Sequence, residues 1–121
     1  MPVPRLLVVD DDPYTRSALE NLLSRRGWVV DLASTVAEGL ARLDPSTRCL
    51  VLDLQLPDGD GLAVLHAARS RCPGVRVAIC SGTEDPARVA SIRLLKPELL
   101  LHKPIELASL FSLCDRTLAA G

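Results

Sequence analysis

Short apolar runs alternate with longer segments of helical periodicity along the whole chain. The runs that resemble β-strands lie at about residues 5–9, 28–32, 49–53, 75–79 and 98–102. The segments that follow them place apolar residues three and four positions apart, as on one face of a helix. Strands that alternate with helices favour right-handed βαβ units and a parallel sheet with helices on its faces. The pattern therefore predicts an α/β fold.

The predicted helices carry recognisable end signals. Asp12 and Pro13 form an N-cap with proline at the first helical position, and this helix should end before Gly27. Thr35 with Glu38 forms a capping box for the second helix. The remaining helices should begin after a turn-rich loop at residues 57–61, at Asp85-Pro86 and just after Pro104.

The composition fits one globular domain that spans residues 1–121. The hydrophobic share of 48% and the charged share of 24% are ordinary, and the formal net charge is only -1. Basic residues are scattered, the longest group being Arg25-Arg26, so the electrostatic pattern of a nucleic-acid-binding domain is missing. We expect one hydrophobic core and no nucleic-acid partner for this domain.

The cysteines and the apolar stretches indicate in which cellular compartment the domain is expected. Cys49, Cys72, Cys80 and Cys114 form no CxxC pair, so we expect no structural disulfide. The sequence shows no charged leader with an apolar core and no apolar stretch of about 20 residues. We therefore expect no membrane contact and a cytoplasmic location.

Functional groups follow four of the five strand-like runs. Asp10 and Asp11 follow the first run, Asp53 ends the third, Ser81 follows the fourth and Lys103 follows the fifth. The carboxyl ends of parallel strands lie along one edge of a sheet, which is where open α/β folds bind their ligands. The acids, the hydroxyl and the lysine should therefore share one site.

The clustered aspartates would need a positive partner. Carboxylates within about 5 Å of one another repel by roughly 3 kcal/mol per pair at an effective dielectric constant near 20. Mg²⁺ prefers such hard oxygen ligands and usually keeps waters and phosphate oxygens in its shell. A simpler alternative exists for each motif, because Asp10 to Asp12 could form a solvated cap, Ser81 a turn, and Lys103-Pro104 a plain strand end.

Taken in order, these motifs resemble a known family over nearly the whole chain. The stretches are LVVDDDP at 7–13, VLDLQLPDGDG at 51–61, Ser81-Gly82 and His102-Lys103-Pro104. The set resembles the receiver domain of two-component response regulators, and four motifs in the right order make a specific signal. The resemblance implies a flavodoxin-like, doubly wound (βα)5 fold whose five-stranded parallel sheet has the strand order 2-1-3-4-5.

The resemblance also implies a metal site. Asp11 and Asp53 would ligate Mg²⁺ directly, the backbone carbonyl of Gln55 would be a third ligand, and Asp10 would hold the metal through water.

Asp53 would be the phosphoryl acceptor by the same resemblance. Its carboxylate would take the phosphoryl group from a sensor histidine kinase or a histidine phosphotransfer protein. Lys103 would pair with the phosphoryl oxygens, the Ser81 hydroxyl would move to bond one of them, and a cis peptide bond would precede Pro104. The domain would catalyse its own phosphorylation and dephosphorylation, yet act mainly as a signalling module for a downstream protein or a fused output domain.

Some positions depart from the family pattern. Leu100 stands where most receivers have a tyrosine or phenylalanine that turns inward on activation, and Lys96-Pro97 replaces a small Gly-Ala pair. The aromatic half of the usual switch is therefore absent. Gly82 should leave the phosphoryl group open to water or to a small phosphodonor, and Gln55 and Thr83 occupy positions that tune its hydrolysis in the family.

Three other functions compete with this interpretation. A receiver-like domain could serve only as a constitutive interaction module, which Leu100 leaves open. A phosphatase of the haloacid dehalogenase type would use Asp10 as nucleophile and Asp12 as acid, but Tyr14 does not fit that motif and the chain is short for that fold. A dinucleotide-binding domain is poorly supported because no GxGxxG follows the first run.

The remaining polar residues receive structural roles. His66 and His102 have no partner at a metal-ligand spacing and should lie at the surface. Asp58 and Asp60 should form the turn after Asp53 and cap the third helix, and Leu113 is expected on the exposed face of the last helix.

Overall fold

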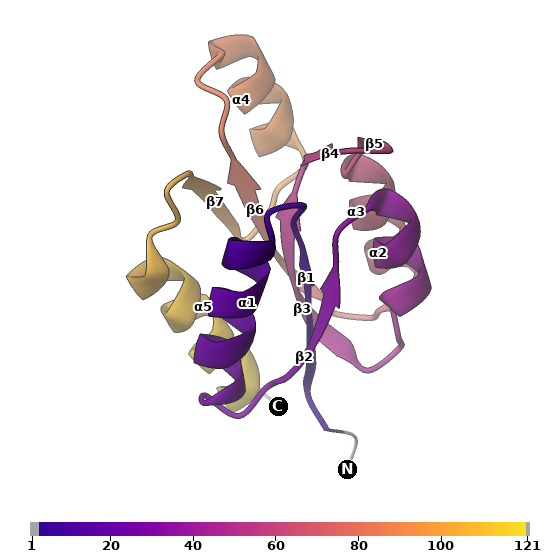
Figure 1. The fold of residues 1–121 in the computed structure, drawn as a ribbon, viewed down its shortest axis with the longest axis vertical. Helices are drawn as coiled ribbons and strands as arrows, with labels where there is room; N and C mark the ends of the chain where they lie inside the picture. Colours follow the sequence, from indigo (N-terminus) through magenta and orange to yellow (C-terminus); the bar gives the residue numbers. More distant parts are fainter. Residues whose placement is uncertain (1–2, 121) are drawn as a thin grey trace.

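Five parallel strands form the centre of the molecule. A computed structural model describes residues 3–120 and shows one five-stranded sheet in the order β2-β1-β3-β6-β7 (Figure 1). Counted along the five long strands this order is 2-1-3-4-5, so the expected doubly wound topology is confirmed. The strands are β1 (Arg5–Val9), β2 (Val29–Ala33), β3 (Thr47–Asp53), β6 (Arg76–Ser81) and β7 (Leu99–His102).

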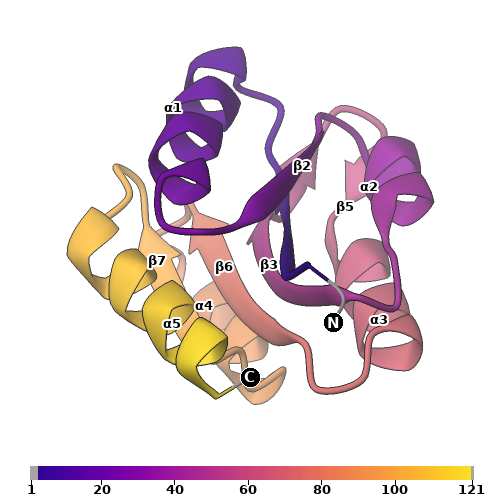
Figure 2. The same cartoon turned by 90° about the horizontal axis from the view of Figure 1, so that it is seen from below.

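Five helices cover the two faces of this sheet. They are α1 (Pro13–Ser24), α2 (Val36–Arg42), α3 (Leu62–Arg71), α4 (Pro86–Leu94) and α5 (Leu107–Ala119). Figure 2 shows α1 and α5 on one side of the sheet and α2 and α3 on the other. The region described contains no helix that is both long and apolar enough to cross a membrane.

The alternation of side chains along the strands divides the core into two hydrophobic clusters. Because successive strand residues point to opposite faces, Leu7 and Leu50 belong to the cluster under α2 and α3, while Leu6 and Val51 belong to the cluster under α1 and α5. Strands buried on both faces explain why the sequence shows continuous apolar runs there. The sheet is therefore packed on both faces, and the carboxyl ends of its strands can hold functional side chains.

A short hairpin replaces part of the expected turn-rich loop. β4 (Gln55–Leu56) and β5 (Gly59–Asp60) pair in antiparallel fashion directly after β3. Each strand has two residues, which is too short for any hydrophobic period to reveal in the sequence.

Polar side chains of this hairpin cap two helices. Asp58 accepts hydrogen bonds from the backbone N–H groups of Val36 (2.7 Å) and Ala37 (3.1 Å), so it caps α2 and not the third helix. Asp60 accepts from the N–H of Leu62 at 3.0 Å, at the start of α3. These hydrogen bonds attach the hairpin to the first turns of α2 and α3.

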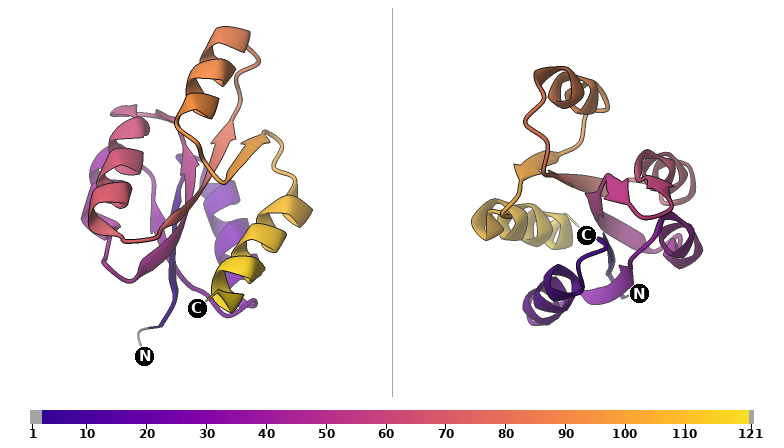
Figure 3. Two further views of the ribbon diagram at one scale, coloured as in Figure 1. Left: turned by 180° about the vertical axis from the view of Figure 1, so that it is seen from behind. Right: turned by 45° about the horizontal axis from the view of Figure 1, so that its top comes forward.

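Helix α4 lies at the periphery of the fold, beside β6 and β7 (Figure 3). Ile92 is its one buried residue among the nine that form the helix. The helix ends at Leu94, and Lys96, two positions further on, has a left-handed backbone with φ of 54°. Most of the surface of α4 is therefore free of tertiary contacts.

One expectation about the last helix is wrong. Leu113 is 3% exposed and packs in the cluster under α1 and α5, whereas Leu107 lies at the surface. This helix begins at Leu107, and Leu110, Leu113 and Cys114 lie on its buried face. Because Leu113 and Cys114 are neighbours in the chain, the helical spacing alone could not show that both belong to that face.

Candidate functional site

The parallel register brings the predicted site residues to one edge of the sheet. Asp10 follows β1, Asp53 ends β3 and Ser81 ends β6. Asp53 is in register with Cys80, and Ser81 is in register with His102, so Lys103 follows one position beyond. Residues up to 93 positions apart in the chain therefore meet where the strands end.

Lys103 lies between two buried carboxylates. Its Nζ atom is 2.8 Å from Oδ2 of Asp53 and 3.2 Å from Oδ2 of Asp10. The two aspartate residues are 5% and 3% exposed, while the lysine side chain is 32% exposed. Burial alone would lower the pKa of Lys103, but its hydrogen bond to Asp53 and the charge of Asp10 outweigh burial and raise that pKa. The lysine is therefore a cation throughout the physiological pH range.

Local backbone groups fix the second oxygen of each buried carboxylate. The N–H of Asp12 donates to Oδ1 of Asp10, and the N–H of Gln55 donates to Oδ1 of Asp53, both at 2.9 Å. Both contacts link a carboxylate to the residue two positions later, which is the geometry of an Asx turn. Each aspartate thus presents a defined oxygen towards Lys103.

Asp11 completes an acidic cluster at this edge. One carboxylate oxygen each from Asp10, Asp11 and Asp53 can be chosen so that all lie within 4.8 Å of one another. Burial raises the pKa of Asp10, although the Asp12 N–H and Lys103 act in the opposite direction. Lys103 therefore compensates only part of the negative charge, and the hard oxygen donors that remain suit Mg²⁺. The side chain of Gln55 is exposed at the rim of the cluster.

Ser81 faces the same site with its hydroxyl hydrogen available. The N–H of Thr83 donates to Ser81 Oγ at 3.2 Å, which uses a lone pair of the hydroxyl and leaves its hydrogen free to donate. The N–H of Lys103 donates to the Ser81 carbonyl at 3.0 Å, so serine and lysine are joined through the backbone. The peptide bond between Lys103 and Pro104 is cis, as expected.

Gly61 is a residue of the site that sequence reasoning treated only as part of a turn. A Cβ atom on Gly61 would lie 2.5 Å from the carbonyl oxygen of Asp53 and 3.0 Å from Cα of Leu54. The N–H of Gly61 also donates to the carbonyl of Leu54 at 2.9 Å. Close backbone approach beneath Asp53 therefore requires glycine here. The DGDG sequence indicated a turn, but nothing in it revealed which glycine touches the strand.

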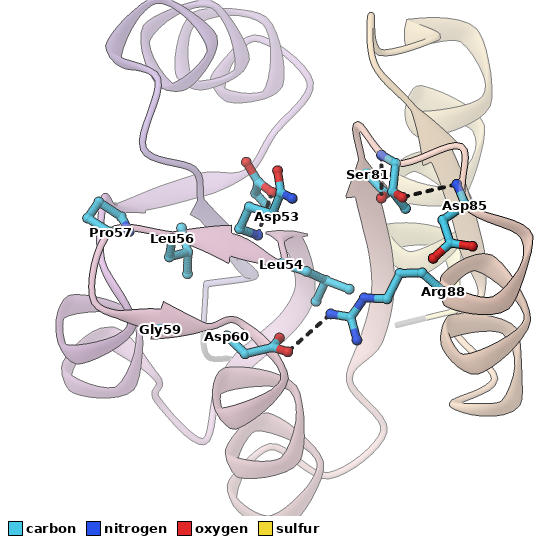
Figure 4. A pocket seen from close by; sticks show the side chains of 11 residues that line it. Asp53, Leu54, Leu56, Pro57, Gly59, Asp60, Ser81, Asp85 and Arg88 are labelled. Carbon is cyan, nitrogen blue, oxygen red and sulfur yellow. Dashed lines mark hydrogen bonds and ion pairs between the residues drawn. The ribbon is translucent and has the colours of Figure 1, made fainter.

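A pocket of about 720 Å³ opens beside Asp53 and Ser81 (Figure 4). Its far wall is formed by Asp60 and Arg88, whose side chains are joined by an ion pair of 3.1 Å. Figure 4 shows Arg88 reaching from α4 past Leu54 towards Asp60. Sequence reasoning missed Arg88, because no motif or spacing links a residue of α4 to the hairpin after β3.

The haloacid dehalogenase alternative fits this geometry poorly. Asp12, which would be its general acid, is the N-cap of α1 and accepts from the N–H of Tyr14 and the hydroxyl of Thr15. The Thr15 hydroxyl is the main cause of a lowered pKa at Asp12. A carboxylate stabilised in its ionised form is a poor proton donor. His66 and His102 are both exposed, as expected.

Fold and site together define a doubly wound α/β domain with an acidic centre at the carboxyl ends of its strands. The family model described as response regulator receiver domain matches residues 6–115. The chain belongs to this family, whose members are the phospho-accepting modules of two-component signal transduction.

Individual relatives agree with this assignment. The chain is 38% identical over 106 residues to the acid tolerance regulatory protein ActR of Rhizobium meliloti, covering 87% of this chain and 55% of the relative. It is 39% identical over 79 residues to the photosynthetic apparatus regulatory protein RegA of Cereibacter sphaeroides, covering 64% of this chain and 42% of the relative. The chain thus spans about half the length of these relatives.

Solved structures show the same architecture. A response regulator receiver domain protein from Methanospirillum hungatei matches with a TM-score of 0.81 and 25% identity, covering 99% of this chain and 100% of that chain. A response regulator protein from Burkholderia pseudomallei, solved with a phosphorylated aspartic acid, a calcium ion and citrate, matches with a TM-score of 0.77 and 24% identity. The match covers 90% of this chain and 65% of that chain, and at this identity it speaks for the fold alone.

Proposed function

We propose that Asp53 is the residue that accepts the phosphoryl group in this receiver domain. One observation carries the proposal: Asp53 is the buried carboxylate at the end of the central strand β3, and it contacts Lys103 and borders the pocket. Its carboxylate oxygen would attack the phosphorus of a phosphohistidine, the P–N bond would break, and the imidazole would leave. The product is an aspartyl phosphate.

Lys103 and Ser81 would then bind the transferred group. The ammonium of Lys103 is already 2.8 Å from Asp53, so a small movement would pair it with a phosphoryl oxygen. The free hydroxyl hydrogen of Ser81 would donate to a second oxygen. Hydrolysis of the acyl phosphate by water in the same pocket would end the signal.

Mg²⁺ is the cofactor that we assign to the acidic cluster. The carboxylates of Asp10, Asp11 and Asp53 would hold it, with the backbone carbonyl of Gln55 as a further ligand. When bound, the ion would neutralise negative charge on the transferring phosphoryl group. Asp10 and Asp53 are held in place by backbone N–H groups, so the ligands are positioned before the ion arrives.

The partners follow from this chemistry. We propose that a sensor histidine kinase or a histidine phosphotransfer protein supplies the phosphoryl group in the cytoplasm, and that residues 1–121 act as one receiver domain. A downstream protein or a fused output domain would read its state. The relatives described as regulatory proteins of acid tolerance and of the photosynthetic apparatus support a regulatory role for the matched module.

Phosphorylation with a small donor tests the assignment. The protein is incubated with Mg²⁺ and acetyl phosphate, and the intact mass is recorded for wild type, Asp53→Asn and Asp85→Asn. Asp85 lines the same pocket and caps α4, where asparagine caps equally well, so Asp85→Asn is a matched control. We expect one phosphoryl group on wild type and on the control, and none on Asp53→Asn.

Other outcomes point elsewhere. Labelling of Asp53→Asn together with loss of labelling in Asp10→Asn would identify Asp10 as the nucleophile and revive the phosphatase alternative. No labelling of wild type, with Mg²⁺ binding confirmed by calorimetry, would leave the constitutive interaction module as the better description.

A further inference from the structure

Arg88 is the one cation among the described residues that line the pocket beside Asp53. Three carboxylates also line this pocket, namely Asp53, Asp60 and Asp85. A phosphodonor that enters the pocket is an anion, and these carboxylates repel it. Arg88 is therefore the lining residue with the charge that an incoming phosphoryl group needs.

The contact that now holds Arg88 is of the weak, exchangeable kind. A single nitrogen, Nη2, lies 3.1 Å from Oδ2 of Asp60, and the two side chains are 36% and 49% exposed. Ion pairs this exposed to water contribute little to stability. Asp60 itself stays fixed, because its Oδ1 accepts from the N–H of Leu62. Arg88 can therefore leave without disturbing the start of α3.

The position of Arg88 is set by a series of hydrogen bonds between residues two positions apart, which starts at Ser81. Thr83 N–H donates to Ser81 Oγ, Asp85 N–H donates to Thr83 Oγ1, and Ala87 N–H donates to Asp85 Oδ1, at 3.2, 3.2 and 3.1 Å. The next residue is Arg88. These bonds hold its backbone near the pocket, while its side chain is free to change partner.

We infer that Arg88 binds the phosphoryl group of a small-molecule phosphodonor as it enters the pocket, and that Asp60 competes with that group for the guanidinium. A phosphoryl group carries more negative charge than a carboxylate and can accept two parallel N–H bonds from arginine. Replacement of Asp60 by the phosphoryl group as the partner of the Arg88 guanidinium is thus favourable. The inference rests on the proposed function, since it concerns delivery of the phosphoryl group to Asp53.

Rates of phosphorylation by acetyl phosphate test the inference. Intact mass is followed over time, at several donor concentrations, for wild type, Arg88→Gln, Asp60→Asn and the double variant. Asp60→Asn removes the charge but keeps Oδ1 for the Leu62 N–H. Arg93→Gln is the matched control, because Arg93 is exposed on the same helix and lies outside this pocket.

The two single variants should change the rate in opposite directions. We expect Arg88→Gln to raise the half-saturating donor concentration by about two- to fivefold, and Asp60→Asn to lower it by a similar factor. The double variant should match Arg88→Gln, because Asp60 acts through Arg88. Arg88→Lys should restore part of the effect, and about 0.5 M salt should shrink all of these differences. Arg93→Gln should match wild type.

A purely structural ion pair predicts a different result. If the pair only held α4 in place, both single variants would impair phosphorylation together and salt would not abolish the difference, which would overturn the inference. Equal rates in all variants would overturn it as well, while leaving Asp53 as the acceptor. If wild type is not labelled at all, the proposed function fails, and the inference fails with it.

Discussion

At the scale of single residues, Lys103 supplies the positive charge that allows Asp10 and Asp53 to be buried together. Lys103→Met keeps the length of the side chain and removes that charge. We expect the free energy of unfolding to fall by about 2 kcal/mol without metal, between the cost of breaking a buried pair and that of losing an exposed one. Saturating Mg²⁺ should recover part of this loss, because it compensates the same carboxylates.

Urea unfolding of wild type and Lys103→Met, each with Mg²⁺ and with a chelator, provides the measurement. An equal loss in both conditions would contradict the view that lysine and metal neutralise the same charges.

Gly61 is required by space beneath Asp53. Gly61→Ala would force the new methyl group against the Asp53 carbonyl, which is 2.5 Å from the position of its Cβ. We expect a loss of about 2 kcal/mol in stability and impaired phosphorylation by acetyl phosphate. Gly82→Ala is the control for stability, since a Cβ there meets no atom within 4 Å. Thermal unfolding compares the stability of the two variants, intact mass reports phosphorylation of Gly61→Ala, and equal stability of the two variants would refute the steric argument.

The residues that carry charge at strand ends could be predicted from the sequence, because a carboxylate or lysine after an apolar strand has few structural explanations. Gly61 and Arg88 could not. Gly61 is needed because two backbone segments lie close together there, and Arg88 is placed by a contact between α4 and the β4–β5 hairpin. Neither the approach nor the contact leaves a periodic or spaced signal in the chain.

At the scale of elements, the backbone just after α4 contains local strain. Lys96 has φ of 54°, a left-handed conformation that glycine adopts without a Cβ penalty, and it precedes Pro97. We expect Lys96→Gly to raise the free energy of unfolding by about 1 kcal/mol, because relief of strain exceeds the added flexibility of the unfolded chain. Chemical denaturation measures this change. A lower stability would show that contacts of the lysine side chain stabilise the fold by more than the backbone strain destabilises it.

Asp58 ties the hairpin after β3 to the first turn of α2. The N–H groups of Val36 and Ala37 lower the pKa of Asp58 from its ordinary value of 3.8. A lowered folded-state pKa means that the contribution of the ionised group to stability is fully present above the unfolded value and is lost as the pH falls through the folded value.

The stability difference between wild type and Asp58→Ala should therefore be constant from about pH 7 to about pH 5, and should shrink below about pH 4. Thermal unfolding across this range tests it. Asp58→Asn keeps one acceptor oxygen and should fall between the two proteins. A difference that grows on acidification would contradict the capping role.

The long elements were predictable because their signals are long. The five strands of the main sheet and the caps at Asp12, Thr35 and Asp85 all appear in the structure. The expected capping box of α2 is altered, since Glu38 accepts from Ser34 and not from Thr35. The β4–β5 hairpin and the buried face of α5 depended on tertiary contacts that no local pattern contains.

At the scale of the whole molecule, the sheet separates two hydrophobic clusters. Leu50 and Val51 are adjacent in β3 but belong to different clusters, whereas Leu50 and Val77 are in register on neighbouring strands and share one cluster. We expect the stability losses of Leu50→Val and Val51→Ala to add within about 0.5 kcal/mol in a double variant. Leu50→Val with Val77→Ala should deviate from additivity by more. Urea unfolding of the two cycles measures both.

This separation also affects how such a chain can change over generations. A substitution in one cluster restricts which residues fit around it in that cluster, while the opposite face of the same strand is left unconstrained. Neighbours along β3 can therefore drift independently, and compensating replacements should arise between residues that are far apart in the chain but on the same side of the sheet. Positions that vary together would then form two interleaved sets, which alternate along every buried strand.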